Sequence, residues 1–150
     1  MIDGVTLKDI ITHGDDRGFF REIIRVSDPL FADGFGQLSH SLVQAGVLKA
    51  WHGHVHQTQW TYAASGVLRV AIHDLRLDSP TRGVTQEVTI GDGQAAVVYR
   101  LPPGVVHGYR CVAGPAHVIY VTSGTYDLAD EVRIVPDDSR IGFNWTEGAR

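Results

Sequence analysis

The sequence contains a single cysteine, Cys111, among 150 residues. One cysteine cannot form an internal disulfide, so the chain is compatible with a reducing cytoplasm. No apolar run approaches the roughly 20 residues of a membrane-spanning helix, and the N-terminus lacks the basic and then apolar segments of a signal peptide. We therefore expect a cytoplasmic protein without a membrane partner.

The sequence also lacks clusters of basic residues. Thirteen Lys and Arg stand against 17 Asp and Glu, which gives a net charge of −4. Nucleic-acid binding needs a basic stripe, so we expect no nucleic-acid partner. A hydrophobic fraction of 43% is ordinary globular usage, and 150 residues have room for one core. The prediction is a single domain over residues 1–150.

Helical periodicity is absent too. Short β-branched and aromatic runs are separated by Gly, Pro and Asp, which is the pattern of strands and turns. The predicted strands are 22–26, 37–43, 47–54, 59–64, 67–75, 86–90, 94–101, 107–112 and 116–122. Residues 146–150 are expected to fray. The chain is therefore predicted to be all-β, as a barrel or a sandwich.

Histidines gather in two separate parts of the sequence. His52 and His54 are two residues apart, and Gln59 follows five residues later. Residues two apart on a strand share a face, so both imidazoles can point into one cavity. A Pro-x-Gly turn ending at Gly104 opens a later strand and can direct His107 into the same cavity. Three imidazoles would then converge.

The spacing of these residues resembles the two sequence motifs of the cupin superfamily. That resemblance implies a jelly-roll β-barrel, which in many members holds a metal on three His and a Glu. One alternative is therefore a metal-dependent cupin enzyme with a divalent transition metal on His52, His54, Gln59 and His107. Gln59 stands where the Glu would be and brings no charge. A metal-bound His52 could not also act as a free base.

A longer resemblance runs from about Asp15 to Trp145. The chain resembles the dTDP-4-dehydrorhamnose 3,5-epimerase family, cupin enzymes that act on 4-keto nucleotide sugars. The matching blocks occur in order along the chain at 16–22, 37–41, 46–52, 74–76 with 79–81, 103–104 with 107–109, Tyr120, Tyr126, Asp138, 141–142 and Trp145.

The resemblance implies a chemical role for three residues. Epimerisation beside a ketone needs a base, a donor for the enolate oxygen and an acid on the opposite face. His52 matches the family's base, Tyr120 matches its proton-returning tyrosine, and Tyr126 matches a further tyrosine of the site. The implied reaction is 3,5- or 3-epimerisation of a dTDP-4-keto-6-deoxyhexose, with no cofactor.

Substrate binding is implied for a wider set of residues. Arg17 and Lys49 are cations that can meet a diphosphate. Phe20 and Glu22 match residues that hold the base end, in the neighbouring subunit of a homodimer. The remaining candidates for substrate binding are Gln37, Ser39, Gln59, His107 and Tyr126.

Three features depart from the family pattern. The family usually has a Lys where this chain has Gln59, and a polar residue such as Gln where it has His54. The family's catalytic His is paired with an Asp from a C-terminal segment that has no counterpart after Trp145. These departures leave a further alternative open, a sugar-nucleotide-binding cupin that is catalytically silent.

Overall fold

Two long strands, β6 (Gln59–Asp74) and β9 (Val105–Thr122), run through the centre of the computed structural model, which describes residues 1–146. They are antiparallel and pair along most of their length. Register shifts interrupt the pairing between Ala63 and Leu68, where Gly66 has a positive φ of 76°. Bulges of this kind bend a strand, so each long strand contributes to two layers.

The first layer contains the beginning of β6 and the end of β9. Beside them lie β1 (Thr6–Asp9), β8 (Val97–Leu101) and β4 (Gln37–Val43). The order across this layer is β1, β8, β6, β9 and β4, with all neighbours antiparallel.

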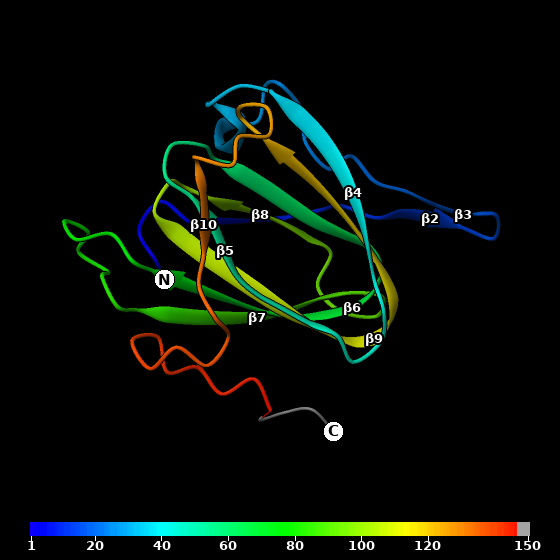
Figure 1. Cartoon of the computed structure of the whole chain (residues 1–150). Helices are drawn as coiled ribbons and strands as arrows, with labels where there is room; N and C mark the ends of the chain where they lie inside the picture. The colour runs from blue at the N-terminus through cyan, green and yellow to red at the C-terminus, as the bar shows by residue number, and fades with distance from the viewer. Residues whose placement is uncertain (147–150) are drawn as a thin grey trace.

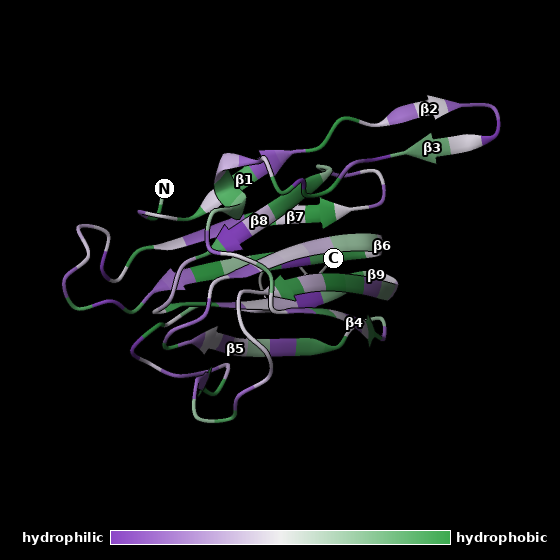
Figure 2. Ribbon diagram, turned by 90° about the horizontal axis from the view of Figure 1, so that it is seen from above, coloured by the Kyte–Doolittle hydropathy of each residue, from purple (hydrophilic) through white to green (hydrophobic). Residues whose placement is uncertain are grey.

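The second layer contains the end of β6 and the beginning of β9. It is completed by β7 (Thr85–Gly91), β5 (Leu48–His54) and β10 (Glu131–Arg133), in the order β7, β6, β9, β5, β10. Figure 2 shows β6 and β9 lying between β7 and β8 on one side and β4 and β5 on the other. The arrangement confirms the predicted all-β jelly roll.

The core lies between these layers and comes mainly from β6, β8 and β9. Alternate residues point inward, as a strand requires. The most buried aliphatic and aromatic side chains of this cluster include Leu68, Val70, Ile72, Tyr99, Val105, Cys111 and Val118. A second cluster packs Trp145, from the C-terminal segment, against Trp51 of β5.

A hairpin of two short strands projects from this body. β2 (His13–Asp15) and β3 (Gly18–Phe20) pair only with each other, and every residue in them is exposed. The hairpin extends well away from the two layers (Figure 1). A single 3-10 turn, η1 (Pro29–Phe31), follows it. No helix among residues 1–146 is long and apolar enough to cross a membrane.

The strand predicted at 22–26 is wrong. Ile23 and Ile24 are partly buried against the cluster that contains Trp60, without joining a sheet. Side chains satisfy part of this backbone, because Lys8 Nζ donates to the Ile23 carbonyl and Asp28 accepts from the Arg25 amide. The predicted strands 59–64 and 67–75 are one strand, β6, and those at 107–112 and 116–122 are one strand, β9. Fraying is predicted for residues 146–150, of which residues 147–150 lie outside the part of the chain that the structure describes.

Candidate active site

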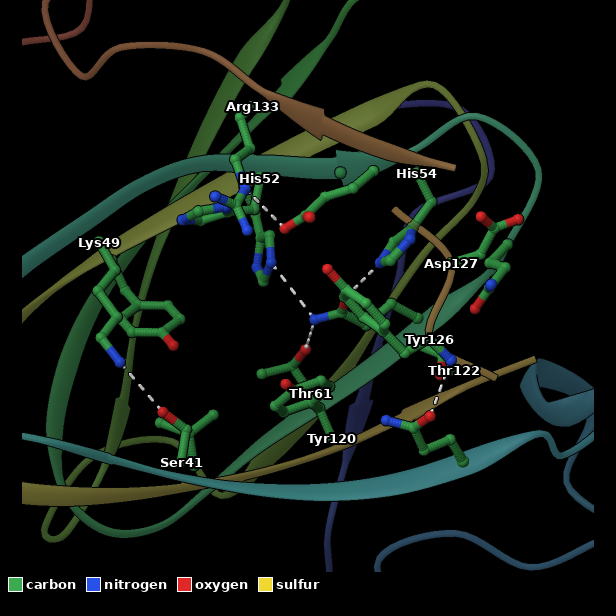
Figure 3. Close-up of a pocket in the computed structure, with 18 residues that line it drawn as sticks. Ser41, Lys49, His52, His54, Thr61, Tyr120, Thr122, Tyr126, Asp127 and Arg133 are labelled. Atoms are coloured by element: carbon green, nitrogen blue, oxygen red, sulfur yellow. Dashed lines mark hydrogen bonds and ion pairs between the residues drawn. The ribbon is translucent and has the colours of Figure 1, made fainter. Parts of the chain in front are cut away.

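A cavity of about 490 Å³ lies between the layers and is lined by β4, β5, β6, β9, β10 and the loop after β9. Most residues that line it have polar or charged side chains, although the core around it is apolar (Figure 3). The lining residues are Gln37, Ser41, Lys49, His52, Gly53, His54, Gln57, Gln59, Thr61, His107, Tyr109, Val118, Tyr120, Thr122, Tyr126, Asp127, Glu131 and Arg133.

The three imidazoles predicted to converge all line this cavity. His52 and His54 lie on the same face of β5, and His52 is directly opposite His107 of β9. On its other side, β5 pairs with β10, where Arg133 is opposite His52 and Glu131 is opposite His54. The period-2 geometry of a strand therefore delivers side chains from three neighbouring strands to one wall.

His52 has the electrostatic properties of a base that is neutral near pH 7. Burial lowers its pKa from the ordinary 6.5, and the nearby carboxylate of Glu131 opposes that shift. The Oε1 atom of Glu131 accepts a hydrogen bond of 2.9 Å from Arg133 Nε. Its Oε2 atom is buried and has no hydrogen-bond partner within residues 1–146. At neutral pH the imidazole of His52 is therefore free to accept a proton.

A chain of hydrogen bonds runs across the cavity from Asp130. The Oδ2 atom of Asp130 lies 3.0 Å from His54 Nδ1, and His54 Nε2 lies 2.9 Å from Gln59 Oε1. The Gln59 amide nitrogen continues the chain, 3.0 Å from Thr61 Oγ1 and 3.4 Å from His107 Nε2. Gln59 is buried, so this chain fixes its side chain in place.

His107 ends the chain and is buried and uncharged. Burial lowers its pKa to about 3, and the charges of His52 and His54 act in the same direction. Its Nδ1 atom lies 2.8 Å from the hydroxyl of Tyr99, whose pKa burial raises well above 10. His107 is thus a neutral, fully bonded part of the cavity wall.

Tyr120 lies across the cavity from His52 (Figure 3). His52 comes from β5 in the second layer, whereas Tyr120 comes from the end of β9 in the first layer, opposite Ser39 of β4 and Thr61 of β6. An imidazole and a phenol therefore line the cavity from two different walls.

Polar candidates on β4 and β5 line the cavity or lie one hydrogen bond away from it. Lys49 Nζ donates to Ser41 Oγ at 3.1 Å, and the Tyr126 amide donates to Gln37 Oε1 at 2.8 Å. Gln37 Nε2 in turn donates to Ser39 Oγ at 3.0 Å. Ser39 itself does not line the cavity, so it reaches the site through Gln37.

Arg17, Phe20 and Glu22 lie outside the cavity of their own chain. Arg17 sits at the tip of the hairpin and pairs with Asp15, with Nη2 2.5 Å from Oδ2. Phe20 is 60% exposed on β3, and Glu22 pairs with Arg25. One copy of the chain does not bring these three residues together with His52.

The four residues of the metal alternative do not present free ligand atoms to a common point. His54 Nε2 faces Gln59 Oε1, and both ring nitrogens of His107 have partners. Within residues 1–146 no group of three or more His, Cys, Asp or Glu side chains is placed to hold a metal ion. The donor set therefore does not fit the metal site suggested by the cupin spacing.

Sequence reasoning missed β10 and the residue before it. Asp130 reaches His54 from 76 positions along the chain, and Glu131 and Arg133 add an ion pair to the wall. The alternation of Glu131, Val132 and Arg133 is a strand signal, but three residues within a charged stretch give it little weight.

Comparisons with known proteins agree with this geometry. The profile of the dTDP-4-dehydrorhamnose 3,5-epimerase family matches residues 1–150. The spore coat polysaccharide biosynthesis protein SpsL of Bacillus subtilis is 43% identical over 97% of this chain and 97% of its own length. A probable low-salt glycan biosynthesis epimerase, Agl13, of Haloferax volcanii is 31% identical over 95% of this chain and 89% of its own length.

Solved structures have the same fold. A dTDP sugar isomerase from Desulfovibrio desulfuricans superposes with a TM-score of 0.90 at 28% identity, covering 97% of this chain and 93% of that one. The epimerase RmlC from Legionella pneumophila, in complex with dTDP-4-keto-L-rhamnose, gives a TM-score of 0.86 at 27% identity, over 96% and 79% of the two chains. The profile match, the relatives and the folds agree, and we conclude that the chain belongs to the dTDP-4-dehydrorhamnose 3,5-epimerase family.

Proposed function

We propose that this protein epimerises a dTDP-linked 4-keto-6-deoxyhexose, at C3 and C5 or at C3 alone, with His52 as base and Tyr120 as acid. The observation that carries the proposal is the placement of a neutral imidazole and a phenol on opposite walls of one polar cavity. Related proteins support the substrate class, because RmlC of Legionella pneumophila is in complex with dTDP-4-keto-L-rhamnose and NovW of Streptomyces spheroides is a 4-keto-6-deoxy sugar epimerase.

The reaction moves protons only. His52 removes a proton from the carbon next to the ketone, and the electron pair of that C–H bond moves into an enolate with its charge on the ketone oxygen. The Tyr120 hydroxyl then donates a proton to the opposite face of the same carbon, which restores the ketone with inverted configuration. Solvent reprotonates the tyrosinate and takes the proton from the imidazolium. No oxidant, reductant or cofactor enters the balance.

The nucleotide end of the substrate would be held by two chains. Lys49, Gln37 and Tyr126 line the cavity of their own subunit, where a cation and an amide suit a diphosphate. Arg17, Phe20 and Glu22 lie on or just after a hairpin that leaves the body of its own subunit. In a homodimer of single-domain subunits, the hairpin would carry these residues to the neighbouring cavity. The free, buried Cys111 agrees with a cytoplasmic enzyme.

Deuterium incorporation tests the assignment of base and acid. In deuterium oxide, the wild-type protein is expected to exchange the proton next to the ketone of dTDP-4-keto-6-deoxyglucose, followed by mass spectrometry and proton NMR. His52→Ala removes the base and is expected to abolish exchange. Tyr120→Phe leaves the base and is expected to allow exchange while blocking inversion.

His56→Ala is the matched control, because His56 is exposed beside the cavity without lining it. It is expected to exchange at the wild-type rate. The assignment is wrong if His52→Ala exchanges as fast as wild type, or if wild type exchanges no proton of any 4-keto sugar nucleotide offered.

A further inference from the structure

The enolate of the proposed reaction places a negative charge in the cavity, and Gln59, the side chain at its buried floor, is a neutral amide. We propose that His54 is held as an imidazolium between Asp130 and Gln59, and that its positive charge on the cavity wall stabilises the enolate. This role rests on the proposed function. The ring nitrogens of His54 are bonded to protein groups, so this residue acts by its charge and not as a hydrogen-bond donor to the substrate.

Asp130 is the first reason to assign a charge to His54. The residue is 3% exposed, and its Oδ1 atom accepts the His56 amide at 2.6 Å. Its Oδ2 atom faces His54 Nδ1 at 3.0 Å, and this is its single ion pair among the residues that the structure describes. A buried carboxylate favours the charged form of a neighbouring imidazole, so Asp130 favours protonation of His54.

The order of donors and acceptors from Asp130 to His107 is the second reason to assign a charge to His54. His107 is neutral, so one of its nitrogens donates and the other accepts. When His107 Nδ1 donates to Tyr99, its Nε2 accepts from the Gln59 amide nitrogen, which also donates to Thr61. The Gln59 oxygen is then the acceptor that faces His54 Nε2. Both nitrogens of His54 therefore donate, which is the definition of an imidazolium.

The surroundings make such a charge effective. The His54 side chain is 21% exposed, so water screens it less than it would a surface cation. Both N–H groups of the Gln59 amide are taken by Thr61 and His107, so the charge of His54 acts across the cavity and not through a hydrogen bond from Gln59. His54 and His52 both line the cavity, where the ketone oxygen would bind next to the carbon that loses its proton.

Moving the charge to the neighbouring position tests the role. His54→Gln is expected to lower the exchange rate constant by about 100-fold with a small change in KM, as the loss of one group that stabilises an oxyanion does. Adding Gln59→Lys returns a cation to the same part of the wall and is expected to restore most of the rate. The matched control combines His54→Gln with Gln57→Lys. It also adds a lysine to the cavity, but the Gln57 side chain donates to the Thr125 carbonyl and takes no part in the hydrogen bonds that join Asp130, His54, Gln59 and His107.

The control double variant is expected to stay as slow as His54→Gln. Thermal melting checks that each variant is folded, and Asp130→Asn, which removes the balancing carboxylate, replaces His54→Gln if the latter does not fold. Equal rates for the two lysine variants, in folded protein, would overturn the proposal.

Nitrogen-15 NMR of labelled histidine gives a readout that is independent of turnover. Two protonated ring nitrogens are expected for His54 in the wild-type protein at pH 7. One bare nitrogen would mean that the Gln59 amide faces the other way, and the charge assignment would be wrong. A wild-type protein with an imidazolium at His54 but no exchange of any 4-keto sugar nucleotide would refute the proposed function and leave this charge state established.

Discussion

At the scale of single residues, His107 shows how burial turns a titratable side chain into a structural one. Its pKa is about 3 in the folded chain, whereas an unfolded histidine titrates near 6.5. Between these two values the unfolded chain binds the extra proton and the folded chain does not. The free energy of unfolding therefore falls as the pH drops from about 6.5 towards 3.

We predict that His107 contributes about 1.4 kcal/mol of lost stability per pH unit in this window. Urea denaturation of wild type and His107→Asn at pH 7, 6, 5 and 4 measures the contribution as a difference in slope. His13→Asn, on the exposed hairpin, serves as the control and is expected to keep the wild-type slope. Parallel pH profiles for wild type and His107→Asn would contradict the prediction.

The imidazoles of the site and Gln59 could be predicted from the sequence, but Asp130 could not. His52 and His54 share a face because of local strand geometry, and a turn motif marked His107. Asp130 has no local signal, because its contact with His54 depends on β10 pairing with β5 from far along the chain. Spacing therefore identifies which residue types meet, and tertiary pairing decides how each is hydrogen-bonded and charged.

At the scale of elements, the bend of β6 is sensitive to the glycine that faces it. Gly91, at the end of β7, has a φ of +117°, and a Cβ built on it would lie 2.0 Å from the carbonyl oxygen of Gly66. Gly93 has a φ of +69° in the adjoining turn with open space around it. Comparing substitutions at these two glycines thus separates the effect of a steric clash from the effect of backbone strain alone.

We predict that Gly91→Ala lowers the free energy of unfolding by about 2 to 4 kcal/mol, since strain and a backbone clash add. Gly93→Ala is expected to cost about 1 kcal/mol, because only a left-handed conformation is imposed on alanine. Urea denaturation gives both values. Equal losses at the two positions would mean that β7 moves away from the bend without cost.

The same bend explains where strand prediction failed. Gly66 and the Gly114-Pro115 pair are turn signals in the sequence, yet pairing continues on both sides of them, from Ser65 with His117 to Val67 with Ala113. A Gly or Pro that lies beside a matching irregularity in the partner strand forms part of a bulge and does not end the strand. β4 contains no Gly or Pro, and its predicted bounds are confirmed.

At the scale of the whole molecule, the proposed dimer makes each cavity depend on two chains. Arg17→Ala and His52→Ala would then damage different cavities when the two variants share a dimer. In that mixed dimer, the cavity that keeps His52 receives Arg17 from its partner. Random assortment of equal amounts leaves about a quarter of all cavities intact.

We predict that co-refolding the two variants restores inversion of the substrate, although each variant alone is weak or inactive. Activity after mixing is compared with the sum of the separate activities, and light scattering gives the mass. The control mixes His52→Ala with Tyr120→Phe, which share one cavity and are not expected to restore inversion. A monomer at micromolar concentration, or no gain on mixing, would place Arg17 in its own subunit's site or outside the site.

Because β6 and β9 belong to both layers, the order in which the strands are synthesised limits when the protein can fold. β4, β5 and β6 are all made before their common neighbour β9. Until residues 105–122 have emerged, neither layer can close, and the apolar faces of the earlier strands stay open to solvent and to other chains. Folding of this jelly roll is therefore a late event in synthesis, and the unpaired edges of β4 and β6 are the surfaces that a chaperone would need to protect.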